Sequence, residues 1–198
     1  MIIREEQQGD TERIREVNLA AFETSTEADL VDSLRRQATP LVSLVAEDDA
    51  NVIGHILLSP VTLAGPPGAH LSLMGLAPMA VVPARRRQGV GSALVREGLA
   101  RCRQLDVAAV VVLGHPEYYP RFGFVPAACL SLRSEYDVPE EAFMVCELRD
   151  GVLRGLSGTI RYHPVFADFQ RFLSDTAWRW AIEISPHGEI SVHRHASI

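Results

Sequence analysis

The beginning of the chain contains two stretches in which apolar residues recur at helical spacing. After Asp10, a residue type that often caps helices, the segment 11–22 keeps its apolar side chains near one face. The segment 26–37 repeats this pattern, and Pro40 follows its end. The pattern predicts two consecutive amphipathic helices, preceded by a short apolar start at 1–4 that suits an edge strand.

The next part of the chain is rich in strand-forming residues. The segments 41–47 and 52–63 flank a short polar turn and predict a β-hairpin. The run 70–82 is also β-rich but contains Gly75 and Pro78. Both residues disfavour an unbroken central strand, so we expect a bulge or a splayed strand there.

After a glycine turn, the pattern of apolar residues becomes that of a helix followed by a buried strand. The segment 90–105 has an apolar face opposite a row of arginines, and 108–114 is a continuous apolar run that suits a strand buried on both faces. Together with the preceding strand they predict a parallel β-α-β unit. We further expect a helical turn and a strand within 116–124, and a strand at 142–148.

Composition limits the possible classes of protein. The chain has 198 residues, of which 47% are hydrophobic, which suits one domain with a real core and excludes an intrinsically disordered chain. No segment approaches the roughly 20 apolar residues of a membrane span, and the first residues do not resemble a signal peptide. A cytoplasmic protein without a membrane interaction is expected.

Charge and cysteine content narrow the choice further. The net charge of -6 disfavours a bulk attraction to nucleic acid, so any anion site must be local. The cysteines Cys102, Cys129 and Cys146 lack C-x-x-C spacing and stand among apolar residues, which predicts buried free thiols in a reducing compartment. His193 and His195 share a strand face, but no carboxylate pattern accompanies them, so no metal site is expected.

A local anion site is indicated between the strand 70–82 and the helix 90–105. Three consecutive arginines, Arg85–Arg87, precede Gly89 and Gly91 at the start of the helix. A glycine turn there exposes unpaired N–H groups at the positive end of the helix dipole, which favours a phosphorylated ligand. A solvated charge run is the alternative. The spacing of a P-loop or a dinucleotide-binding turn is missing, which disfavours ATP and NAD.

Two motifs give this site a family resemblance. The string Arg86–Gly91 fits the signature Q/R-x-x-G-x-G/A, and Tyr119–Phe124 fits Y-x-x-x-G-F. At this spacing the sequence resembles the GNAT acetyltransferase superfamily, and within it the YhbS-like group. The resemblance implies an α/β (mixed α+β) fold: a mixed, mostly antiparallel sheet with a splayed strand, flanked by helices. It also implies a domain at 1–173. The extension 174–198 lies outside the resemblance, and its alternation of apolar and polar residues about a Pro/Gly turn suggests a β-hairpin.

The resemblance implies acetyl-CoA as the acyl donor. Backbone groups on the splayed strand would pair with the pantetheine arm, and those on the glycine turn would hold the pyrophosphate. Arg86 would fill the Q/R position, and the arginines 85–87 are within reach of the 3′-phosphate. The positions concerned are Ala80, Val81 and Val82 on the strand, and Arg87, Gln88, Gly89, Val90, Gly91 and Ser92 on the turn.

The resemblance also implies direct attack of an amine on the thioester, with an N–H near Val81 polarising the carbonyl. Tyr119 aligns with the tyrosine that protonates the departing thiolate. Packing of Tyr119 in the core is the alternative, and Tyr118 is the neighbour that a one-residue shift would put in its place. The segment 71–82 contains no acidic residue, so the base must come from elsewhere. Glu27 is the first candidate, followed by His70 and His115.

The function that these features predict is N-acyl transfer to a primary amine. The helix pair 10–37 and the loop 132–141 would wall the acceptor side, and the acidic groups of that loop favour a cationic acceptor. A non-catalytic acyl-CoA-binding module is the main alternative, and acylation of aminoacyl-tRNA is disfavoured by the charge. Trp178 and Trp180 offer an apolar surface in the extension, which predicts a homodimer.

Overall fold

A computed structural model describes residues 1–65 and 71–172 of the chain. The strands are β1 (Ile2–Glu5), β2 (Val42–Asp48), β3 (Asn51–Ala64), β4 (Leu73–Val81), β5 (Ala109–Leu113), β6 (Val125–Pro126), β7 (Leu132–Ser134), β8 (Phe143–Glu147) and β9 (Gly158–Arg161). The helices are α1 (Thr11–Ala21), α2 (Thr26–Gln37), α3 (Val90–Gln104) and α4 (Val165–Phe172). The 3-10 turns are η1 (Gln8–Asp10), η2 (Pro83–Arg85), η3 (Tyr119–Phe122) and η4 (Ala127–Leu130). The hairpin predicted at 174–198, with its tryptophans and histidines, lies outside the described residues, as does His70.

The strands form one mixed sheet in the order β1-β2-β3-β4-β5-β8-β6. Of the neighbouring pairs on this path only β4 and β5 are parallel, with α3 as the connection between them. The far end of β3 pairs with β9, which in turn pairs with β7. The mostly antiparallel sheet, the β2-β3 hairpin and the parallel β-α-β unit are therefore confirmed.

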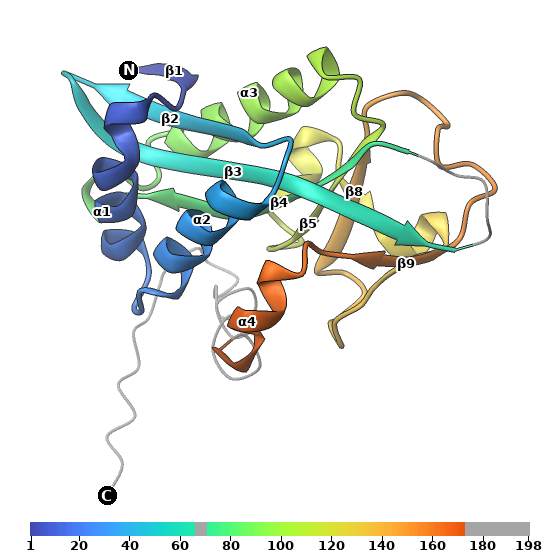
Figure 1. The fold of residues 1–198 in the computed structure, drawn as a ribbon. Coiled ribbons are helices and arrows are strands. Elements are labelled where there is room, and N and C mark those ends of the chain that lie inside the picture. The colour runs from blue at the N-terminus through green and yellow to red at the C-terminus, as the bar shows by residue number, and fades with distance from the viewer. Residues whose placement is uncertain (66–70, 173–198) are drawn as a thin grey trace, which may run out of the picture.

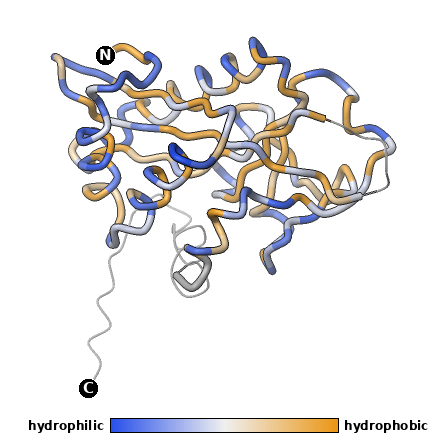
Figure 2. Tube along the Cα trace, in the orientation of Figure 1, coloured by the Kyte–Doolittle hydropathy of each residue, from blue (hydrophilic) through white to orange (hydrophobic). Residues whose placement is uncertain are grey.

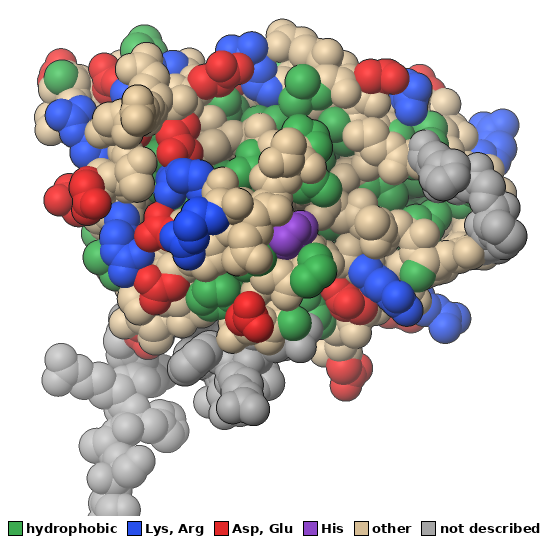
Figure 3. All heavy atoms as spheres, in the orientation of Figure 1, with side chains coloured by type: hydrophobic (Ala, Val, Ile, Leu, Met, Phe, Trp, Pro, Cys, Tyr) green, Lys and Arg blue, Asp and Glu red, His purple; other side chains and the backbone are tan. Residues whose placement is uncertain are grey.

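Helices cover both faces of the sheet. Figure 1 shows α1, α2 and α4 on one face and α3 on the other. Each face has its own apolar core, and Figure 2 shows the hydrophobic positions concentrated along the central strands. Burial of these side chains is the main source of stability, at roughly 25 cal/mol per Å² of apolar surface. On the face drawn in Figure 3, acidic and basic side chains are interspersed.

Three expectations from the sequence need correction. The loop predicted at 132–141 begins with β7, because β9 offers its edge to this segment. Cys129 is exposed, since Ala127 is the residue of its 3-10 turn that faces the core. Asp10 does precede α1, but its side chain makes no cap bond to that helix. Its carboxylate accepts hydrogen bonds from the Gln7 N–H at 2.8 Å and from Arg4 at 2.6 Å.

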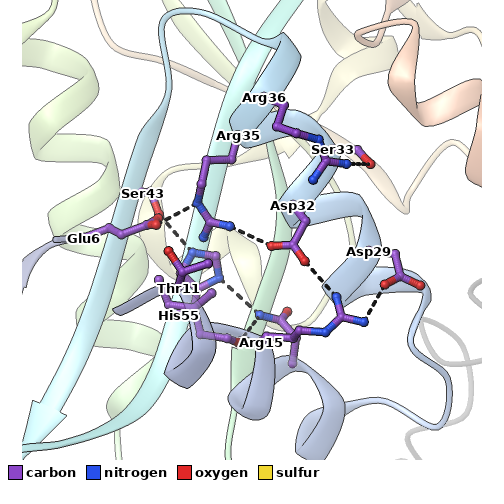
Figure 4. A network of polar contacts seen from close by, with 12 residues as sticks. Glu6, Thr11, Arg15, Asp29, Asp32, Ser33, Arg35, Arg36, Ser43 and His55 are labelled. Carbon is purple, nitrogen blue, oxygen red and sulfur yellow. Dashed lines mark hydrogen bonds and ion pairs between the residues drawn. The ribbon is translucent and has the colours of Figure 1, made fainter. Parts of the chain in front are cut away.

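A buried polar network attaches α1 and α2 to the sheet (Figure 4). At its centre is His55 of β3, which is fully buried. Its Nδ1 lies 3.4 Å from Asn18 Nδ2 of α1, and its Nε2 lies 3.0 Å from Ser43 Oγ of β2. Ser43 donates to Glu6, whose carboxylate also accepts a bond from Arg35 Nε of α2 at 2.7 Å. The chain of bonds fixes a neutral His55 with its proton on Nε2.

The burial of His55 predicts a pH-dependent stability. Burial, with a smaller contribution from the nearby Arg35 charge, lowers the pKa of His55 from 6.5 to about 3. At pH 5 the unfolded chain therefore binds a proton that the folded chain does not, so stability falls as the pH falls. This site alone should cost about 2 kcal/mol between pH 7 and pH 5. Urea unfolding of the protein and of His55→Gln at both pH values measures it: the wild type should lose about 2 kcal/mol more than the variant. Equal losses in the two proteins would contradict the assignment.

Candidate active site

The strand β4 departs from its neighbour β5 partway along its length. Pairing with β5 extends over Leu73–Leu76 only, whereas pairing with β3 continues to Val81. After Leu76, β4 carries two residues, Ala77 and Pro78, opposite the single residue Leu57 of β3, which is a β-bulge. Proline has no N–H to contribute to a ladder, so the bulge falls where the ladder would be weakest. The splayed strand that the sequence predicted is confirmed.

The hydrogen bonds of β4 show which backbone groups face the side that β5 has left. The N–H of Val82 donates to the carbonyl of Ile53 on β3 at 3.0 Å. Ala80, two residues earlier, faces the same way, because backbone direction alternates along a strand. The carbonyl of Val81 faces the other way and accepts a bond from Arg86 Nε at 3.4 Å. β3 thus uses the groups predicted for pantetheine at Ala80 and Val82, and Val81 and Met79 face the open side instead.

The sequence alone does not determine which of the two alternating sets of β4 backbone groups faces the open side. The alternation rule links positions 79 and 81 as firmly as 80 and 82, and only the register against β3 distinguishes the two sets. Met79 is therefore a candidate position on this open edge that the sequence reading missed. Val81, by contrast, was named in advance, and its orientation agrees with a role at the reacting carbonyl.

The helix α3 begins beside this strand with a glycine in the left-handed conformation. Gly89 has φ 84° and forms the cap before Val90, and a Cβ built on it would meet nothing within 4 Å. The N–H groups of the first turn, at Val90, Gly91 and Ser92, have no acceptor within the helix. Open space, several aligned donors and the positive end of the helix dipole make this turn a fitting cradle for a pyrophosphate.

The three arginines before the glycine differ in their surroundings. Arg85 forms an ion pair with Asp48 at 2.7 Å, and Arg86 donates to the carbonyl of Ala21 on α1 at 2.7 Å. Arg87 is exposed and has φ 60°. Arg85 and Arg86 thus attach the turn to neighbouring elements. A charge run that is merely solvated, the alternative considered above, would not make these contacts. Among the three, Arg87 is the side chain whose exposure suits contact with a phosphate.

The adjacent tyrosines of η3 have separate environments. Tyr119 is buried, its ring 5.5 Å from that of Phe124, and a Cβ at Gly114 would lie 2.3 Å from it. The hydroxyl of Tyr118 instead lies 3.4 Å from Ser92 Oγ at the start of α3. Burial, and secondarily the neighbouring Tyr118, raises the pKa of Tyr119, so this phenol stays protonated. The core packing considered for Tyr119 is present, and it is compatible with a proton donor.

Glu27 lies in the first turn of α2, on the face of the sheet opposite α3. Its Oε2 is buried without a hydrogen-bond partner among the described residues. Burial raises the pKa of Glu27, which moves a carboxylate toward the range of a general base. The other candidate base within the described ranges is His115, which stands shortly before η3 and is partly exposed. Of the two, Glu27 has the surroundings that a base requires.

Two kinds of site are missing from the part of the chain that the structure describes. Within residues 1–65 and 71–172, no group of three or more His, Cys, Asp or Glu side chains could hold a metal ion. Over the same ranges, no helix has both the length and the apolar character needed to span a membrane.

Comparison with known proteins identifies the family. A model described as an acetyltransferase (GNAT) domain matches residues 2–127, which include both motifs. The chain belongs to the GNAT family of N-acetyltransferases. Within that family, the N-acetyltransferase YhbS of Escherichia coli strain K12 is 41% identical over 170 residues, covering 85% of this chain and 100% of that protein.

Two solved structures of GNAT proteins match most of this chain. The crystal structure of Escherichia coli YhbS in complex with CoA matches with a TM-score of 0.78 and 40% identity, over 84% of this chain and 91% of that one. A GNAT acetyltransferase from Brucella melitensis in complex with acetyl-CoA matches with a TM-score of 0.68 and 36% identity, over 83% and 97%. The family and the fold inferred from the two motifs are confirmed.

Proposed function

We propose that the protein transfers the acetyl group of acetyl-CoA to a primary amine by direct attack in a ternary complex. The observation that carries the proposal is the juxtaposition of two donor surfaces: the edge of β4 that β5 has left, and the glycine-capped start of α3 that follows it. One suits an extended pantetheine arm and the other a pyrophosphate. The CoA and acetyl-CoA present in the two related structures support the same ligand here.

Each part of the ligand has residues that can hold it. The N–H groups of the turn from Arg87 to Ser92 would bind the pyrophosphate, and Gly89 leaves the space that its phosphates need. The backbone of Met79 and Val81 would pair with the pantetheine amides as a neighbouring strand would. Arg87 would approach the 3′-phosphate. In this arrangement the ligand fills the place beside β4 that β5 gives up.

When bound, acetyl-CoA supplies an activated thioester carbonyl. The backbone N–H of Val81 would stabilise negative charge on the carbonyl oxygen during attack. Glu27 would accept the proton that the amine loses, through water where needed, and Tyr119 would give a proton to the departing thiolate. The raised pKa of each group suits its role, because Glu27 becomes a better base and Tyr119 stays protonated. One proton is taken and one is given, so the cycle balances.

A panel of primary amines tests the proposal. The protein is incubated with acetyl-CoA and n-butylamine, tyramine, agmatine, spermidine or a peptide with a free α-amino group, and CoA release is followed with a thiol reagent. Because Cys129 is exposed, a sample without amine must be subtracted. Amine-dependent CoA release supports acyl transfer. Saturable acetyl-CoA binding without release to any amine would instead favour the non-catalytic acyl-CoA-binding module.

Replacing Glu27 should remove the base. We expect Glu27→Gln to lower kcat/KM for the amine about 100-fold at pH 8, a typical contribution of general base catalysis. In the wild type, kcat/KM should fall below a pKa that lies above the usual glutamate range, and this acidic limb should disappear in the variant. Steady-state rates from pH 5 to pH 9 measure both effects. Glu23→Gln, an exposed neighbour, is the control and should keep the wild-type profile; an unchanged limb in Glu27→Gln would assign the base elsewhere.

The remaining expectations from the sequence stay predictions. They are a homodimer, a cytoplasmic location, no nucleic-acid partner, no metal, and a domain boundary at 173/174. The cationic acceptor also stays a prediction. It gains support from Glu27, a partly buried carboxylate on the face where α1 and α2 lie.

A further inference from the structure

Tyr162, directly after β9, is held rigidly against β4. Its ring stacks on Tyr136 with 5.4 Å between centroids, and Phe166 of α4 lies 5.2 Å away. The Tyr162 N–H donates to the carboxylate of Glu135 at 2.6 Å. A Cβ built on Gly75 would lie 2.9 Å from the ring, so only glycine at this position admits it. Three separate segments thus fix one phenol.

The hydroxyl of this fixed ring is buried and has no hydrogen-bond partner among the described residues. The hydroxyl of Ser59 is also buried and without a partner there. Ser59 is the β3 residue paired with Gly75, and its side chain is on the same face as those of Leu57 and Val61. Two unsatisfied hydroxyls therefore flank Gly75. Buried polar groups are rarely left unpaired, so an absent ligand is the physical explanation to consider.

The position of these hydroxyls relates them to the reaction. Gly75 immediately precedes Leu76, the last β4 residue that pairs with β5, so both hydroxyls lie where the splay begins. They are on the face covered by α1, α2 and α4, whereas α3 and its pyrophosphate cradle are on the other. Tyr119 lies close enough to contribute to the raised pKa of Tyr162. An amine that attacks a donor bound from the α3 side must approach from this face.

We propose that the Tyr162 hydroxyl, assisted by Ser59, binds and orients the nitrogen of the acceptor amine at the start of the β4–β5 splay. This inference rests on the proposed N-acetyltransferase reaction and adds a positioning residue to it. The phenol oxygen accepts an N–H of the neutral amine, which directs the nitrogen lone pair toward the thioester carbon. Burial keeps Tyr162 protonated, so it orients the amine and leaves proton removal to Glu27.

Tyr162→Phe separates this role from a structural one. The change removes only an oxygen that has no partner in the described protein, so the melting temperature without ligands should be equal to or above that of the wild type. With the amine from the panel that gives the highest kcat/KM, the acceptor KM should rise about tenfold. The acetyl-CoA dissociation constant should stay within twofold. Ser59→Ala should change the same parameters in the same direction.

Thr159→Val is the matched control, because it removes a hydroxyl from β9 at a partly exposed position. It should keep the wild-type KM. A lower melting temperature in Tyr162→Phe, with KM unchanged, would show a structural hydroxyl and overturn the inference. Wild-type kinetics in both Tyr162→Phe and Ser59→Ala would overturn it as well, while leaving the proposed reaction standing. If the wild type releases no CoA with any amine, the proposed reaction itself fails and the inference fails with it.

Discussion

Gly89→Glu should abolish binding of acetyl-CoA, with a loss of affinity greater than 100-fold in a calorimetric titration. The substitution puts a carboxylate at the glycine turn, where the donor N–H groups of α3 would otherwise meet the pyrophosphate. Repulsion between the two negative groups and the bulk of the side chain act in the same direction. The fold should survive, because a Cβ at this position meets nothing within 4 Å and a carboxylate near a helix N-terminus is favourable.

The cost that remains is backbone strain, and it can be matched in a control. Gly89 has φ 84°, where a residue with a Cβ loses roughly 1–2 kcal/mol. Gly155 has φ 78° and equally open surroundings, in the loop before β9. Gly155→Glu therefore carries the same charge and similar strain away from the cradle, and it should bind acetyl-CoA like the wild type. Saturable binding by a folded Gly89→Glu variant would refute the cofactor site.

Tyr119→Phe should lower kcat about 100-fold while leaving the KM for acetyl-CoA nearly unchanged. The variant keeps the ring that packs on Phe124 and removes the proton that the thiolate needs, so the loss should fall on the chemical step. Thiolates with electron-withdrawing substituents leave without protonation. A donor whose thiol has a low pKa should therefore recover much of the lost rate, and a change in packing alone would allow no such recovery.

Tyr118→Phe completes this comparison. The Tyr118 hydroxyl lies beside Ser92 and Gly91, near the predicted pyrophosphate, and Arg121 lies over its ring. We expect this variant to change acetyl-CoA affinity by a few fold with little effect on kcat. The reverse pattern, a large loss of kcat in Tyr118→Phe and none in Tyr119→Phe, would assign the proton donor to Tyr118.

Most of the fold could be predicted from the sequence, because local periodicity determines most of its elements. Each element of the helix pair, the β2-β3 hairpin and the β-α-β unit, and the splay as well, has a pattern that can be read within about fifteen residues. β7 and β9 have three and four residues, too few for a period. They become strands because β3 extends beyond its pairing with β4 and offers a free edge at Thr62–Ala64. That edge is a property of the assembled sheet.

Some parts of the candidate site could likewise be predicted from the sequence, and others could not. The glycine turn, the arginines and Tyr119 were found from motifs, since each motif specifies residue types at fixed spacing. The direction of each β4 backbone group depends on the register with β3, which no local pattern encodes. Tyr162 has no motif at all. Its position emerges only when β9 brings it against Gly75, which is 87 residues earlier by the numbering of the chain.

The bulge in β4 also constrains how this chain can vary over evolutionary time. Because Ala77 and Pro78 together stand opposite Leu57, straightening the bulge without changing the length of the strand would shift its register by one residue and reverse the direction of every backbone group from Met79 to Val82. Deleting one of these two residues would leave that direction unchanged, because Met79 would still pair with Ile56. Most substitutions along this strand alter one side chain each, but a substitution that removed the bulge would invert the whole edge at once. The bulge, more than the identity of most residues, is therefore the property of this strand that has to be inherited unchanged.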